Sequence, residues 1–168
     1  MTKGKGKDGK LGTAHAKAGE LLVCSNNRAL RDYEIEERLE AGMVLVGSEV
    51  KSLRARAADL EGSYAAISHN ELVLHGMHIG PYAQANQFGH EARRVRKLLA
   101  HKEEIKRMIG KLGAPGYTLV PLKVYFKGGR AKVELGLGKG RKREDKREQL
   151  KKEIDLREAK AAMSRGKH

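Results

Sequence analysis

The sequence predicts a mainly β protein: a small closed antiparallel barrel with a few short helices, followed by a basic C-terminal tail. Short apolar segments that alternate with polar residues recur along residues 20–138, separated by Gly, Asn and Pro. This pattern is typical of antiparallel strands joined by turns. About six such strands in some 120 residues favour a closed barrel, because closure removes the exposed edges of a sheet. A flat two-layer α+β arrangement is the alternative.

The first half of this body is expected to be mostly strands. GELLVCS (19–25) predicts a first strand, which the Asn26-Asn27 pair ends. In YEIEERLEAG (33–42), a strand-like start leads into a predicted short helix over Glu36–Ala41, which Gly42 ends. The strand-like segments that follow are MVLVGSEVKSLRARAADL (43–60), SYAAIS (63–68) and ELVLHGMHI (71–79), with a hairpin turn at Ser68-His69-Asn70.

The second half combines one helix with a hairpin. In LLAHKEEIKRMIGKL, apolar side chains recur at helical spacing on one face, which predicts a helix over Leu98–Leu112. Gly113 and the Pro115-Gly116 pair end it. The alternating segments YTLVPLKVYF (117–126) and RAKVELGL (130–137) flank Lys127-Gly128-Gly129 and predict a β-hairpin.

Charge and composition divide the chain into three parts. Residues 1–20 hold five lysines against two acids, and residues 139–168 hold twelve Lys and Arg against six Asp and Glu, with few large apolar groups in either. We therefore expect a flexible basic arm at 1–19, a folded body at 20–138 and a basic tail at 139–168. In the tail, acids stand four residues before bases, and the apolar residues form only a thin stripe. This pattern predicts a tail that is disordered when free and helical along a partner.

The net charge indicates a polyanionic partner. A formal charge of +14 at pH 7 exceeds what solubility requires, so nucleic acid is expected rather than a membrane surface. No apolar run approaches the roughly 20 residues that span a bilayer, and the N-terminus lacks the apolar centre of a secretion signal. The single cysteine, Cys24, excludes an internal disulfide and suits a reducing cytoplasm, where we expect the protein to act.

Motifs for catalysis or metal binding are weak. Glycines 136, 138 and 140 lack the spacing of a phosphate-binding loop and are interpreted as a flexible strand end. His75 and His78 would point to opposite faces of a strand and could share a metal only with further ligands. Because no nucleophile, base and oxyanion site come together, we expect a binding protein without catalytic residues, metal or cofactor.

The aromatic content indicates which kind of RNA is bound. Five tyrosines, two phenylalanines and no tryptophan are few for a barrel that grips single strands by base stacking. Recognition of folded RNA through phosphates, sugars and shape is the better fit. A place in the core is the preferred interpretation for each of the tyrosines: Tyr33, Tyr64, Tyr82, Tyr117 and Tyr125.

A set of motifs, in order over residues 26–147, resembles the SsrA-binding protein (SmpB) family. The motifs are Asn26-Asn27-Arg28-Ala29, Asp32-Tyr33, EAGMVLVGSEVKSLR (40–54), Ser63-Tyr64, RKLL (96–99), GYTLVPLKVYF (116–126) and GKGRKREDKR (138–147). EAG followed by GSEVKSLR at this spacing is the most specific of them. The resemblance implies a barrel of the oligonucleotide-binding type. It also implies a protein that binds the tRNA-like domain of transfer-messenger RNA (SsrA RNA) and delivers it to stalled ribosomes for trans-translation and ribosome rescue.

The resemblance also implies which residues contact RNA: Asn26, Arg28, Tyr33, Glu40, Leu99 and Lys132. Arg28 and Lys132 are natural phosphate contacts. Glu40 can accept a hydrogen bond from a base amino group or a 2′-hydroxyl, orient a neighbouring arginine, or form an ion pair at a helix end. Leu99 can equally belong to the core.

In this family the tail enters the vacant message channel of the small ribosomal subunit, near the decoding centre, and becomes helical there. The tail residues implied in this contact are Lys139, Arg141, Lys142, Asp145, Lys146, Arg147 and Met163. Three positions depart from the family pattern: Arg31 and Glu144 stand where rings are frequent, and Glu91-Ala92 replaces a common Asp-Pro.

The implied partners are transfer-messenger RNA and the ribosome, with elongation factor Tu and alanyl-charged transfer-messenger RNA as a further candidate. The chain is expected to be a monomer. Two rival interpretations are a ribosomal protein that binds ribosomal RNA permanently and an RNA-modifying or RNA-cleaving enzyme.

Overall fold

The computed structural model describes residues 18–84 and 89–165, so most of the arm predicted at 1–19 lies outside the described residues. It is mainly β, with a few helices. The elements are β1 (Glu20–Ser25), α1 (Asn27–Asp32), β2 (Tyr33–Met43), α2 (Gly47–Arg54), β3 (Ala58–Asp59), β4 (Tyr64–Ser68), β5 (Glu71–His75), β6 (His78–Ile79), β7 (Arg96–Leu99), α3 (Lys102–Leu112), β8 (Tyr117–Lys127), β9 (Arg130–Gly140) and α4 (Arg143–Arg165).

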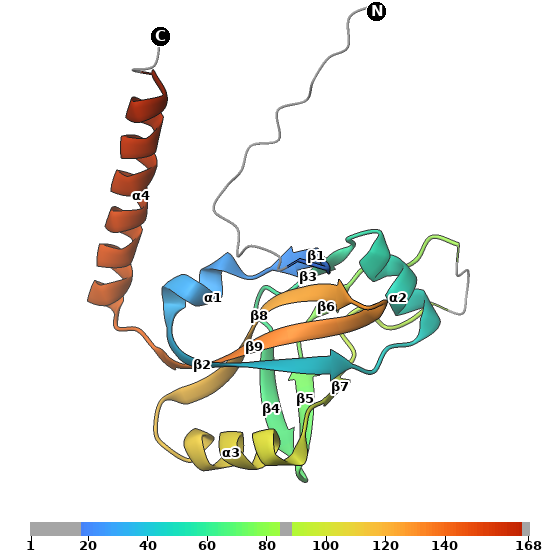
Figure 1. The fold of residues 1–168 in the computed structure, drawn as a ribbon. Coiled ribbons are helices and arrows are strands. Elements are labelled where there is room, and N and C mark those ends of the chain that lie inside the picture. The colour runs from blue at the N-terminus through green and yellow to red at the C-terminus, as the bar shows by residue number, and fades with distance from the viewer. Residues whose placement is uncertain (1–17, 85–88, 166–168) are drawn as a thin grey trace, which may run out of the picture.

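The large sheet returns on itself. Its strand order is β1-β8-β4-β5-β7-β2-β9, and β9 also pairs with β8, so the pairings of the last six strands form a ring. All of these pairs are antiparallel. β3 and β6 form a separate two-stranded pair. In Figure 1, α3 lies at one end of the sheet beside the β4–β5 hairpin, and α4 projects away from the sheet next to α1.

The strands enclose one main apolar core. Alternate residues of β9, namely Val133, Leu135 and Leu137, are buried, as the period of two along a strand requires. The helices add Leu53 from α2 and Met108 from α3 to the same core. A place in the core is confirmed for Tyr125, which is 2% exposed, but is wrong for Tyr64, which is 49% exposed on β4.

The helix predicted over Glu36–Ala41 is wrong, because this segment is the middle of β2. The strand pairs with β9 from Tyr33 opposite Gly140 to Gly42 opposite Lys132. Leu39 and Ala41 are buried, whereas the residues between and before them are more exposed. Charged side chains on both faces hid the alternation of the strand in the sequence, because Glu37 shares the face of Leu39 and Ala41.

Two further element predictions need correction. The GSEVKSLR segment, taken as strand-like, is helix α2, and the Val46 N–H that precedes it donates to Glu49 Oε2 at 3.0 Å. The helix predicted from Leu98 begins only at Lys102, because Leu98 pairs with Met43 on β2 and with Leu72 on β5. The β8–β9 hairpin is confirmed, and so is the turn between β4 and β5, where His69 and Asn70 have positive φ.

β9 continues to Gly140, so the folded body extends beyond Gly138. The tail forms helix α4, whereas disorder was expected of the free tail. Its pairs with an acid four residues before a base, such as Glu148 and Lys152, favour a helix. The disorder of a tail without a partner stays a prediction. Within residues 18–84 and 89–165, neither α4 nor any other helix has the length and apolar character that crossing a bilayer requires.

Candidate nucleic-acid interface

The residues expected to contact RNA line two different hollows in the surface. The first, here called the α1 hollow, has a volume of about 480 Å³ and is lined by Asn26, Arg28, Ala29, Asp32, Tyr33, Glu61, Gly62, Ser63, Tyr64, Thr118 and Val120. The second, here called the β2–β7 hollow, is lined by Glu40, Gly42, Leu99, Ala100, His101, Glu104 and Lys132. Three of the expected residues fall in each hollow.

In the α1 hollow, Asn26 fixes the position of helix α1. Its Oδ1 accepts a hydrogen bond from the Ala29 N–H at 3.1 Å, and its Nδ2 donates to the Pro121 carbonyl at 3.2 Å. The first bond caps the helix and the second ties it to β8. Much of the side chain's hydrogen-bonding capacity is therefore used inside the protein, and Asn26 serves to present its neighbour Arg28.

Arg28 brings a positive charge to the α1 hollow, and its side chain is 67% exposed. Its Nη1 donates to Glu61 Oε1 at 2.8 Å, and its Nε lies 3.6 Å from Asp32 Oδ2. Exposed ion pairs of this kind contribute little stability. A phosphate can therefore replace these carboxylates at small cost.

Two tyrosines border the same hollow in different ways. Tyr33 is half-buried and packs against Ala29 and β8. The Tyr64 ring stacks on the ring of His75 with centroids 5.0 Å apart. Sequence reasoning did not select Tyr64 as a site residue. The signal that could have found it is the hairpin register, which sets Tyr64 directly opposite His75.

In the β2–β7 hollow, Leu99 is 55% exposed, so the alternative that it belongs to the core is wrong. It lies on β7 opposite Gly42 of β2. Lys132 Nζ donates to Glu40 Oε1 at 2.8 Å across the β2–β9 pair. An exposed apolar side chain thus lies next to a lysine–glutamate pair.

Glu40 is held by several donors on the outer face of the sheet. Besides Lys132, the Tyr125 hydroxyl donates to Glu40 Oε2, and Lys127 Nζ lies 3.5 Å from the same oxygen. The hydrogen bonds from Lys132 and Tyr125 lower the pKa of Glu40 to about 2. Because Glu40 lies within a strand and its partners are lysines and a tyrosine, the ion pair at a helix end and the orientation of an arginine are both wrong.

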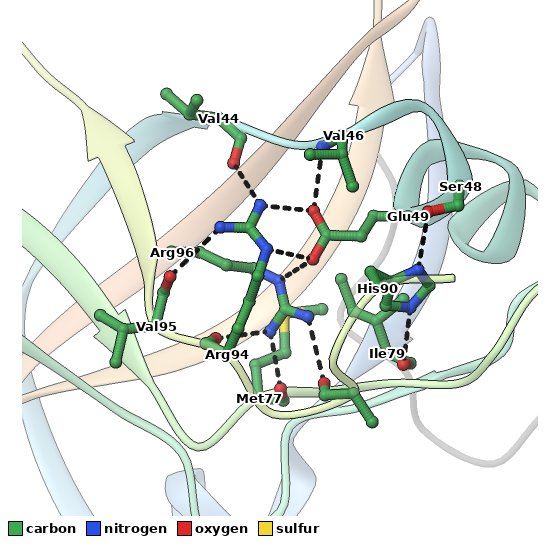
Figure 2. A network of polar contacts seen from close by, with 11 residues as sticks. Val44, Val46, Ser48, Glu49, Met77, Ile79, His90, Arg94, Val95 and Arg96 are labelled. Carbon is green, nitrogen blue, oxygen red and sulfur yellow. Dashed lines mark hydrogen bonds and ion pairs between the residues drawn. The ribbon is translucent and has the colours of Figure 1, made fainter. Parts of the chain in front are cut away.

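A buried ionic network holds the segment that leads into β7. Glu49 of α2 accepts from Arg94 Nη2 at 2.6 Å and from Arg96 Nε at 2.8 Å (Figure 2). Arg96 also donates to the Met77 carbonyl, and the side chains of Glu49 and Arg96 are both fully buried. The most specific motif of the sequence, GSEVKSLR, therefore contributes a framework for β7 and its exposed Leu99.

The electrostatics of this network favour the ionised carboxylate. Burial alone raises the pKa of Glu49, but hydrogen bonds from Arg94 and the Val46 N–H, together with the charge of Arg96, outweigh burial. The pKa of Glu49 therefore lies below its usual value. Near it, His90 bridges the Ser48 hydroxyl and the Ile79 carbonyl, at 2.9 and 3.0 Å (Figure 2).

The expected tail residues lie on β9, on the connection that follows it and on α4. Lys139 is on β9, with its Nζ 5.7 Å from the centre of the Tyr117 ring. The Arg141 N–H donates to the Asp32 carbonyl at 2.8 Å, and Lys146 Nζ lies 3.7 Å from Asp32 Oδ1, so the tail begins beside the α1 hollow. The remaining residues of the set are exposed: Lys142, Asp145, Arg147 and Met163.

The positions that depart from the family pattern have different surroundings. Arg31 lines a small hollow between α1 and α4, together with Lys146. The Ala92 carbonyl accepts from the Ile79 N–H and from Arg96, so the Glu91-Ala92 segment belongs to the framework of β7. In the described part of the chain, no group of three or more His, Cys, Asp or Glu side chains is arranged to hold a metal ion.

Comparisons with known proteins agree with one another. The family model described as SmpB protein matches residues 23–165. The SsrA-binding protein of Geobacter sulfurreducens is 54% identical over 145 residues, which cover 86% of this chain and 95% of the relative. The SsrA-binding protein of Carboxydothermus hydrogenoformans is 51% identical over 144 residues, which cover 86% of this chain and 97% of that relative. A solved structure described as "tmRNA-SmpB: a journey to the center of the bacterial ribosome" has a TM-score of 0.62 and 47% identity, and covers 79% of this chain and 95% of that chain.

Proposed function

The chain belongs to the SmpB family of SsrA-binding proteins, and from this premise we propose how its surfaces divide the work of trans-translation. The protein binds transfer-messenger RNA and acts in trans-translation on the ribosome. The observation that carries this function is the family match over residues 23–165, a range that includes both hollows and all of α4. It acts by binding, without catalysis, in the cytoplasm where ribosomes work.

The folded body binds the tRNA-like domain of transfer-messenger RNA. The ring of paired strands is a barrel of the oligonucleotide-binding type, and its two hollows are the RNA-contacting surfaces. The exposed guanidinium of Arg28 and the ammonium of Lys132 suit phosphate contacts on folded RNA. Leu99 contributes an apolar contact to a sugar or base edge beside Lys132.

The tail, from Arg141 onward, enters the empty message channel of the small ribosomal subunit. This proposal is supported by the exposed side chains of α4 and by its projection away from the sheet in Figure 1. A basic excess suits a channel lined by ribosomal RNA, because counterion release favours binding. Elongation factor Tu, with alanyl-charged transfer-messenger RNA, is a further partner that we propose from family membership alone.

Binding to three RNAs over a salt series tests the function. The purified chain is titrated with the tRNA-like domain of transfer-messenger RNA, with ordinary tRNA and with unstructured RNA. We expect the tRNA-like domain to keep a preference of about 10-fold or more, or about 1.4 kcal/mol, as salt rises. Equal binding of all three RNAs, with parallel loss in salt, would contradict shape recognition and favour a ribosomal protein.

A further inference from the structure

The carboxylate of Glu40 is already occupied by groups of the protein itself. Its Oε1 accepts from Lys132 Nζ at 2.8 Å, and its Oε2 accepts from the Tyr125 hydroxyl with Lys127 Nζ 3.5 Å away. A carboxylate has about four lone-pair positions, so two hydrogen bonds and a further ammonium group beside Oε2 leave little capacity for an RNA donor. Glu40 is thus poorly suited to direct RNA contact, although it borders the β2–β7 hollow.

The two lysines, in contrast, keep donors available for a ligand. Each ammonium carries three N–H donors. Lys132 Nζ directs one of them at Glu40 Oε1, and Lys127 Nζ forms an ion pair with Glu40 Oε2 at 3.5 Å. The side chain of Lys127 is 52% exposed and that of Lys132 is 29% exposed. Two neighbouring ammonium groups repel each other, and long side chains sample many rotamers. The shared carboxylate counters both effects and holds the two cations together before RNA arrives.

Tyr125 fixes the carboxylate in turn. Its ring is 2% exposed and lies between the strands β1 and β9, which pair with β8 on either side. Lys123 Nζ lies 4.8 Å from the ring centroid, further restricting the ring. A buried ring with one hydroxyl directed at Glu40 Oε2 defines the position of that oxygen. Tyr125 itself is too buried to reach RNA.

We propose that Lys127 and Lys132 form a two-lysine clamp for backbone phosphates of RNA, in which Glu40 and Tyr125 are positioning residues. Lys132 and Glu40 line the β2–β7 hollow with the exposed Leu99, and Lys127 approaches the same carboxylate from the end of β8. It adds Lys127 as a further RNA-binding residue and gives the acid at position 40 a role that does not require contact with RNA. The inference rests on the proposed function, because the RNA is taken to be the tRNA-like domain.

The test is a salt series of binding to the tRNA-like domain with the full-length chain and single variants. For Lys127→Ala and Lys132→Ala we expect weaker binding and a salt slope reduced by about 1 each, as for lost phosphate contacts. The matched control is Lys111→Ala. Lys111 is a lysine of α3 that pairs with Glu37, another acid of β2, and not with Glu40. The control should leave the slope closer to that of the wild type.

The positioning residues are tested by variants that separate charge from geometry. Glu40→Gln raises the net positive charge, so simple attraction predicts tighter binding, whereas the clamp predicts weaker binding. Tyr125→Phe keeps every charge, and we expect about 2- to 10-fold weaker binding with an unchanged salt slope, the effect of one lost hydrogen bond. Thermal unfolding of each variant checks that the fold is kept.

The possible results distinguish a failure of the clamp from a failure of the proposed function. If the wild type prefers the tRNA-like domain but Lys127→Ala behaves like Lys111→Ala, the clamp is wrong and the proposed function stands. Tighter binding by Glu40→Gln would likewise remove its positioning role. If the wild type shows no preference among RNAs, the proposed function is wrong. The clamp is then wrong as well, because its ligand was taken to be the tRNA-like domain.

Discussion

The carboxylate of Glu49 lies where no water reaches it, and its neighbours are two guanidinium groups rather than one. It accepts from Arg94, from Arg96 and from the Val46 N–H. Moving such charges out of water is costly, and the cost is offset only while every member of the network is present. Removing the acid leaves Arg96, which is fully buried, without its counter-charge.

We therefore predict that Glu49→Gln lowers the free energy of unfolding by about 3–5 kcal/mol, the usual range for a buried ion pair that loses one partner. Urea denaturation at neutral pH measures the change. The matched control is Glu71→Gln, which breaks the 2.6 Å pair with Lys97 between side chains 53% and 47% exposed. An exposed pair contributes about 0–1 kcal/mol. Similar losses in the two variants would contradict the framework role of Glu49.

At the scale of elements, the sequence predicted those parts of the fold that depend on contacts between neighbouring segments. The β8–β9 hairpin and the β4–β5 turn join neighbouring segments, so turn residues and alternation were sufficient. β2 was mistaken in part for a helix because its main partner, β9, lies almost a hundred residues later, as in the Arg38–Glu134 pair 96 positions apart. Strand pairing between segments so far apart in the sequence overrides the local helix propensity of a segment.

The candidate site was predictable only in part for the same reason. Positive charge indicated nucleic acid and the low aromatic content indicated folded RNA, but the individual residues came from family motifs. The contact that explains Glu40 joins it to Tyr125, 85 positions away, and no local pattern indicates it. The exposure of Leu99 depends on β7, and helical periodicity had assigned the last two residues of this strand, Leu98 and Leu99, to the helix that follows.

Gly138 of β9 has a packing role that its interpretation as part of a flexible strand end missed. Where β9 passes the bulge in β2 between Ile35 and Glu37, the two backbones approach closely. A Cβ on Gly138 would lie 2.8 Å from the Glu34 carbonyl oxygen and 2.9 Å from Ile35 Cδ1. Only glycine fits this approach without a shift of the backbone.

We predict that Gly138→Ala lowers the free energy of unfolding by about 1–3 kcal/mol, the range for an overpacked site. Gly140→Ala is the matched control, because a Cβ there has no atom within 4 Å and the residue lies on the same strand. The control should change stability by less than about 0.5 kcal/mol. Urea denaturation of both variants measures the difference, and equal effects would show that the close approach at Gly138 is not limiting.

At the scale of the whole molecule, the body and α4 are joined near one residue of α1. Asp32 accepts from the Arg141 N–H through its carbonyl and lies 3.7 Å from Lys146 through its carboxylate. Because these contacts are made by α1 and not by the sheet, α4 can separate from the body without disturbing the sheet. β9, in contrast, is part of the sheet as far as Gly140, opposite Tyr33.

We predict that a chain ending after Lys142 binds the tRNA-like domain within about 3-fold of the full chain but loses ribosome rescue, because it keeps β9 and the Arg141–Asp32 hydrogen bond while α4 is gone. RNA titration and a reconstituted rescue assay on ribosomes stalled at the end of a message measure the two activities. A chain ending after Gly138 is the comparison, since it also removes two residues of β9 and should unfold at lower temperature. Equal loss of RNA binding and rescue by the Lys142 truncation would contradict the division of work between body and tail.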